Sequence, residues 1–141
     1  PGAENLDWWL MINEVASVGD DQIELYNPGT QAAPVAGWFV VDADFPGDPT
    51  HQYALPVGTS VAAGGYLVLV KDTDHDFGIG ADDAIRLCLP ADTDCADPVD
   101  EITWTGHADP SFGRETDGAE DWYLCTAASW NSSNNCPAPA P

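Results

Sequence analysis

Basic residues are almost missing from this sequence. It holds three of them, against 24 acidic residues, and its formal net charge is -21. Proteins that bind nucleic acids use Lys and Arg to displace counterions from the phosphates. Negatively charged membrane surfaces attract the same basic side chains. We therefore expect neither a nucleic acid nor a membrane surface as the partner of this chain.

Three other absences narrow the possible folds and functions. No run approaches the roughly 20 apolar residues of a membrane-spanning helix, and no segment shows a sustained helical period of apolar residues. No serine lies in the Gly-x-Ser-x-Gly turn of many hydrolases. The histidines His51, His75 and His107 are scattered along the chain. An enzyme is not expected, and a hydrolase with an unrecognised site is kept only as an alternative.

The chain instead contains short strand-like runs that are separated by Gly, Pro and Asp turns. Residues 66–70 are apolar on both faces, which predicts a central strand that is covered on both sides. Residues 106–120 look irregular. About eight strands of this length and spacing predict an all-β fold, an antiparallel β-sandwich. The expected strands are residues 8–16, 22–27, 37–41, 66–70, 84–89, 99–104 and 121–125, with weak edge strands at 52–55 and 59–61.

The four cysteines predict two disulfides and an oxidising, extracellular or cell-surface environment. Three pairings are possible. We favour Cys88–Cys95 and Cys125–Cys136 because each pair closes a short local loop. A zinc site is the alternative, but the gaps do not match the close cysteine pairs that structural zinc sites use.

Several short motifs occur in the order in which one known family carries them. The chain resembles a lamin tail domain, of the secreted bacterial type, over roughly residues 10–125. The motifs that carry the resemblance are Gly37-Trp38, the Tyr-Ala-Leu-Pro-Val-Gly-Thr step at 53–59, Gly-Gly-Tyr-Leu-Val-Leu at 64–69, Asp-Glu-Ile-Thr-Trp at 100–104, and Ser-Phe-Gly-Arg at 111–114 followed by Asp117-Gly118 and Trp122.

This resemblance implies an immunoglobulin-like β-sandwich that acts as a non-catalytic accessory or interaction module of a larger secreted or surface protein. The expected partner is another protein or a cell-surface component. We place the domain at residues 8–130, after an N-terminal tail of residues 1–7. Residues 131–141 form a C-terminal segment that ends in Pro and Ala, which predicts the start of a stiff linker.

One acidic loop suggests a calcium site. Asp72, Asp74 and Asp76 alternate along it, and Asp82 and Asp83 lie at its end. Carboxylate oxygens are the ligands that Ca²⁺ prefers. A solvated acidic loop is the alternative. Weaker versions of the same spacing occur at residues 42–44 and 92–94.

Glu14 and Glu24 lie inside predicted strands, where a carboxylate must be paired if it is buried. A metal site or a pair of catalytic carboxylates is one interpretation. The other is structural, with hydrogen bonds from the backbone or from Arg114. We expect Arg114 to be a structural clamp, with Asp100 or Asp117 as its partner.

Three of the six tryptophans, Trp8, Trp9 and Trp130, lie outside the matching motifs. Exposed tryptophans can stack on sugars or anchor a partner protein. A carbohydrate-binding module that uses these three residues is therefore the second functional hypothesis.

Overall fold

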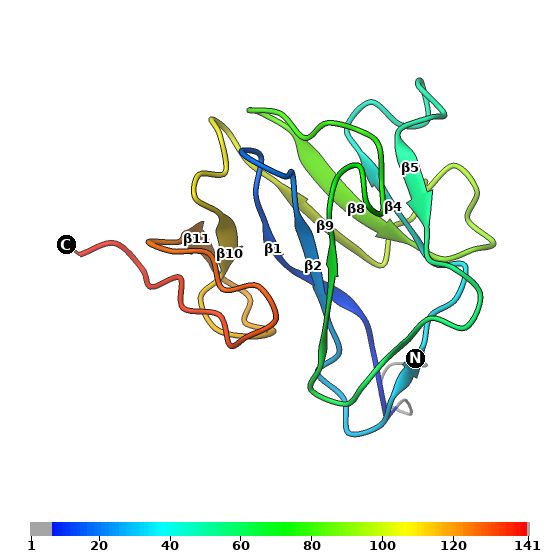
Figure 1. The fold of residues 1–141 in the computed structure, drawn as a ribbon, viewed down its shortest axis with the longest axis horizontal. Coiled ribbons are helices and arrows are strands. Elements are labelled where there is room, and N and C mark those ends of the chain that lie inside the picture. Colours follow the sequence, from blue (N-terminus) through cyan, green and yellow to red (C-terminus); the bar gives the residue numbers. More distant parts are fainter. Residues whose placement is uncertain (1–6, 141) are drawn as a thin grey trace.

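The computed structural model describes residues 7–140, and eleven strands and no helix occur among them. Most of the expected N-terminal tail lies outside the described residues. All strand pairs are antiparallel (Figure 1). The strands are β1 (Met11–Val15), β2 (Ile23–Tyr26), β3 (Ala33–Pro34), β4 (Phe39–Asp42), β5 (Gln52–Ala54), β6 (Ser60–Val61), β7 (Tyr66–Leu69), β8 (Ala84–Cys88), β9 (Asp100–Thr103), β10 (Phe112–Arg114) and β11 (Trp122–Leu124).

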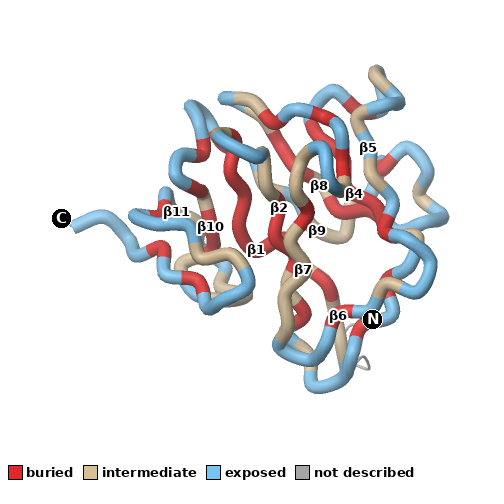
Figure 2. The backbone as a smooth tube through the Cα atoms, viewed as in Figure 1, coloured by how far each residue is buried: buried red, intermediate tan, exposed pale blue. Residues whose placement is uncertain are grey.

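Two larger sheets enclose one core. The first sheet has the strand order β11-β10-β1-β2-β7 and the second has the order β5-β4-β8-β9, while β3 and β6 form a small separate pair. Alternate residues of each strand face inward, as Ile23 and Leu25 do in β2 and as Ile85 and Leu87 do in β8. Figure 2 shows β1, β2, β4 and β8 as the most buried strands. The predicted all-β sandwich is confirmed.

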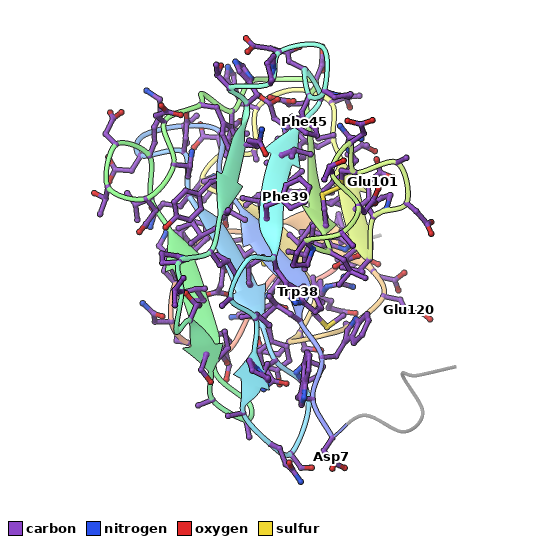
Figure 3. All side chains as sticks on the ribbon, turned by 90° about the vertical axis from the view of Figure 1, so that its right-hand side faces the viewer. Asp7, Trp38, Phe39, Phe45, Glu101 and Glu120 are labelled. Atoms are coloured by element: carbon purple, nitrogen blue, oxygen red, sulfur yellow. A yellow bond between two sulfur atoms is a disulfide. The ribbon has the colours of Figure 1, made fainter. Side chains whose placement is uncertain are left out.

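β4 is buried on both faces because a second apolar cluster covers its outer side. Val40 faces the main core, whereas Phe39 and Val41 face the second cluster with Phe45. The ring centroids of Phe39 and Phe45 are 6.0 Å apart, and Figure 3 labels Phe39 on β4 and Phe45 beyond the end of this strand. The Cys88–Cys95 disulfide completes this cluster.

β1 changes its inward face at a bulge. Its register with β2 shifts between Ile12 and Glu14. One extra residue reverses which side chains point inward. Ile12 and Val15 therefore lie in the core, while Asn13 and Glu14 share the outer face of the sheet with Glu24.

Two sequence predictions about strands were wrong. Residues 66–70 were expected to form a central strand, but β7 lies at the edge of its sheet and three of its four residues are only half-buried. Its apolar character comes from packing of Tyr66 on Tyr26 and of Leu67 on the core, and neither contact needs a central position. Residues 106–120 looked irregular, yet they contain β10, whose short Phe-Gly-Arg sequence has no strand-like alternation.

Candidate functional site

An apolar pocket opens between the segment that follows β9 and the strands β10 and β11. Its volume is about 500 Å³, within the range of roughly 300–1,000 Å³ that is usual for ligand sites. Trp104 and Phe112 supply aromatic surface, and His107 and two threonines supply polar groups. The lining residues are Thr103, Trp104, Thr105, His107, Ala108, Phe112 and Leu124.

Leu124 is the most accessible apolar side chain of this pocket. It is 57% exposed, although leucines are usually buried. β10 and β11 pair so that Leu124 lies directly opposite Phe112, and both side chains therefore share the pocket face of the sheet. The Phe112 ring also packs on Trp122, with 5.5 Å between the ring centroids. The two strands together present a continuous apolar row at the sheet edge.

Exposed acidic residues lie on the chain segments that adjoin the pocket lining. Asp82 accepts a hydrogen bond from the backbone N–H of Gly106, so its carboxylate lies beside the segment that lines the pocket. Figure 3 shows Glu101 and Glu120 pointing outward on the same side of the molecule. Asp109, Glu120 and Asp121 are also exposed and adjoin, in the sequence, the segments that line the pocket.

The three cations of the chain do not neutralise these acidic residues. Lys71 lies beside Asp72, with 3.8 Å between the ammonium nitrogen and the carboxylate. Arg86 donates to three backbone carbonyl oxygens around the second apolar cluster. Arg114 is buried and paired with Asp100. The pocket therefore combines an apolar lining with exposed carboxylates on the adjoining segments of the chain.

The loop expected to bind calcium uses several carboxylates to hold its own backbone. Asp74 accepts the N–H of Val70. Asp83 accepts the N–H groups of Ala43, Gly80 and Ala84.

Those aspartates consequently lie in separate turns rather than around one ion. Among the described residues, the one group of three or more metal-ligating atoms within 4.8 Å of each other comes from Asp42, Asp44 and His51. The structure does not gather Asp72, Asp74, Asp76, Asp82 and Asp83 into one ligand set. Calcium binding by this chain stays a prediction.

His51 joins three aspartates of the loop between β4 and β5. Its Nδ1 lies 2.7 Å from the buried carboxylate of Asp42 and 3.6 Å from Asp44, and its Nε2 lies 3.3 Å from Asp48. The hydrogen bond to Asp42 raises the pKa of His51, and burial raises the pKa of Asp42. Both shifts favour the protonated forms of these two side chains. The spacing Asp42-x-Asp44 is visible in the sequence, but the contribution of His51 is not.

The outer face of the five-stranded sheet is covered by residues 126–136, and we call this region the covered face. Glu14 accepts hydrogen bonds from the hydroxyl of Ser111 and from both the N–H and the hydroxyl of Ser129. Glu24 accepts from Asn13 and from the N–H of Asn131. Burial raises the pKa of Glu24 to about 7, against the effect of these hydrogen bonds. The structural interpretation of both glutamates agrees with these contacts.

The Cys125–Cys136 disulfide holds the covering segment over β10. Both sulfurs lie close to Gly113, where an added Cβ would be 2.9 Å from the sulfur of Cys136. Glycine is needed there because any side chain would displace the segment. Both cysteine pairs expected from the sequence lie at disulfide distance.

The side chain of Arg114, at the end of β10, contacts the backbone of β1. Its Nε donates to the carbonyl of Ile12, and Asp100 accepts both from the N–H of Ile12 and from Arg114, at 2.9 Å. Of the two expected partners, Asp100 therefore pairs with Arg114. Asp117 lies instead on the covered face, where it accepts from Asn13 and Tyr66 and raises the pKa of Tyr66, together with burial, to about 12.

The tryptophans expected on the surface are not exposed. Trp8 and Trp9 are half-buried and pack on Trp38, with ring centroids 6.0 and 5.8 Å away, and Trp130 is also half-buried. Trp8 and Trp9 also pack against the main core. This arrangement leaves no flat row of three exposed rings for stacking on sugars.

One serine–histidine contact occurs beside the pocket. His107 Nδ1 lies 3.0 Å from the hydroxyl of Ser17, which accepts the N–H of Ala108. Ser17 is buried and braces the segment beside the pocket. No carboxylate occurs among the described residues that line the cavity.

Comparison with known proteins identifies the family. The family model described as Lamin Tail Domain matches residues 9–106, which is more than half of the 141 residues. The chain belongs to the Lamin Tail Domain family. Searches of curated proteins and of solved structures gave no match.

Lamin tail domains are non-catalytic, immunoglobulin-like interaction domains. The matched range ends before β10, β11 and the covering segment. No helix among the described residues is long and apolar enough to cross a membrane. The two disulfides fit an extracellular protein.

Proposed function

We propose that this domain is a non-catalytic accessory module that binds a partner protein through the apolar pocket beside β11. The observation that carries this proposal is the pocket itself, with Leu124 more than half exposed at its edge. An apolar side chain held in water costs free energy, which burial by a partner would recover. Membership of an interaction-domain family supports the same conclusion.

The charge of the domain selects the chemistry of the partner. A net charge of -21 attracts cationic surfaces and repels acidic ones. The acidic residues around the pocket place this field at the docking point. The partner therefore presents an apolar side chain that enters the pocket and Lys or Arg residues on either side of it. Complementary charge of this kind raises the association rate and excludes wrong partners.

The larger protein that carries this module is secreted or exposed at a cell surface in this proposal. Two disulfides persist in an oxidising compartment. The Pro- and Ala-rich end of the chain suits a spacer between modules.

Selection from a displayed library of short random peptides tests this function. We expect the selected peptides to share an apolar residue flanked by Lys or Arg. Their affinity should fall at least about tenfold for the variant Leu124→Asp, a loss of roughly 1.4 kcal/mol.

The matched control is Val57→Asp, which introduces the same charge at a fully exposed valine outside the pocket. This variant should keep the affinity of the unmodified domain within about twofold, a difference below roughly 0.5 kcal/mol. Peptides that bind both variants equally well would show that the pocket is not the binding site.

A further inference from the structure

The outer edge of β11 offers backbone N–H and C=O groups to which another strand could hydrogen-bond. β11 is the last strand of the five-stranded sheet, and only β10 pairs with it among the described residues. A strand at a sheet edge leaves half of its backbone N–H and C=O groups without a strand partner. Such groups can pair with an extended segment of another chain.

β11 is only three residues long, but it carries none of the charges or prolines that protect edge strands from pairing. β9, at the edge of the other large sheet, begins with two acidic residues, and charges on an edge discourage an incoming strand. The three residues of β11 are Trp, Tyr and Leu. The charges near β11 precede it, at Glu120 and Asp121. They repel acidic chains and leave the strand itself free to pair.

The register of β11 determines which side chains of an added strand would face the pocket. Directly opposed residues of neighbouring antiparallel strands lie on the same face of a sheet. Phe112 and Leu124 are such a pair, and both line the pocket. A residue placed opposite Leu124 on an added strand would extend this row by one position. Its side chain would lie on the pocket face, while its two sequence neighbours would point to the other face.

We propose that the partner adds an extended, basic segment to the edge of β11 as a sixth strand of this sheet, with an apolar residue opposite Leu124. This inference rests on the proposed function and specifies how the partner binds. Backbone hydrogen bonds supply a general part of the affinity, and the pocket selects the side chain. A second copy of this chain is not the occupant, because two domains that each carry -21 repel one another.

Methylation of single backbone nitrogens in a selected peptide tests this binding mode. In an added strand, alternate N–H groups point toward β11 and the others point to solvent. Methylation of an N–H that faces β11 removes a hydrogen bond and introduces a clash. We expect the affinity to fall at least about tenfold at every second position near the apolar residue, and to change less than about threefold at the positions between.

The other outcomes separate this inference from the proposed function. Affinity that depends on Leu124 but shows no alternation along the peptide would overturn strand addition and leave the pocket as the binding site. Failure to select any peptide that depends on Leu124 would overturn both. Circular dichroism and the melting temperature of Leu124→Asp verify that a loss of affinity does not come from unfolding.

Discussion

Two regions of the five-stranded sheet, the covered face and the pocket beside β11, differ in how completely they are packed. On the covered face, the carboxylates of Glu14 and Glu24 each receive two or three hydrogen bonds, and a disulfide holds the segment above them. At the pocket, Leu124 and an edge strand lie open to solvent. In a chain with 24 acidic residues, the buried carboxylates stabilise the fold, while the apolar opening is where the proposed partner would bury most apolar surface.

The largest effect is expected on the covered face for Glu14→Ala. This change removes the acceptor of the buried Ser111 hydroxyl and of the half-buried Ser129 N–H and hydroxyl, and it opens a cavity. Such losses cost about 1–3 kcal/mol for each orphaned group, so the free energy of unfolding should fall by roughly 3–5 kcal/mol. Urea denaturation measures the change. The control Glu101→Ala, at an exposed glutamate, should lower the free energy of unfolding by under about 0.5 kcal/mol. Equal losses for the two variants would contradict the claim that the buried glutamate stabilises the fold.

Removal of the disulfide over the covered face should have the next largest effect. Cys125 and Cys136 are 11 residues apart in the sequence, and a loop of this size is worth about 3 kcal/mol in the chain-entropy model. In the variant with both cysteines changed to alanine, hydrogen exchange should accelerate at Ser129 and Asn131, whose N–H groups bind the two glutamates. Exchange that stays slow there would show that the segment does not need its disulfide.

A pH dependence is expected from Glu24. Its pKa is about 7 in the folded domain and 4.5 as the ordinary value, so the folded state holds the proton more tightly than the unfolded chain. The stability that comes from this group is fully present below pH 4.5 and is lost as the pH rises to about 7. The loss is of the order of 3 kcal/mol. Melting temperatures between pH 4 and pH 8, at high salt to screen the surface charge, should fall less for Glu24→Gln than for the unmodified domain. If the melting temperatures of the two proteins fall equally with pH, the pH dependence comes from groups other than Glu24.

The smallest effect on stability is expected at the pocket. Leu124 is 57% exposed, so Leu124→Asp should change the free energy of unfolding by less than about 0.5 kcal/mol while it removes binding of the selected peptides. A thermal melt and a binding titration on the same sample separate the two properties. A loss of stability above about 2 kcal/mol would mean that this leucine serves the fold instead.

The sequence predicts the regular strands better than the site. β2 and β8 place aliphatic side chains in the core at alternate positions, and this sequence pattern alone locates them. β10 could not be predicted from the sequence because its glycine is required by a disulfide whose two cysteines come later in the chain. The pocket could not be predicted from the sequence for a similar reason. Its lining combines Trp104 with Phe112 and Leu124, and the strand pairing that brings them together has no local signal.

The acidic residues show the same limit. Alternating aspartates predict converging ligands, but Asp74 and Asp83 bind backbone N–H groups of their own loops. Burial of Glu14 and Glu24 could be suspected from their positions inside strands. The covering segment that makes this burial favourable could not, because its residues lack a strand pattern.

NMR mapping of a selected peptide on the isotopically labelled domain tests the central claim most directly. If the open pocket is the functional surface, the largest chemical-shift changes fall at Thr103–Ala108 and Trp122–Leu124, and the amides of the covered face keep their positions. Changes centred on residues 126–136, or on the loop that holds Asp42 and His51, would contradict this account and place the partner elsewhere.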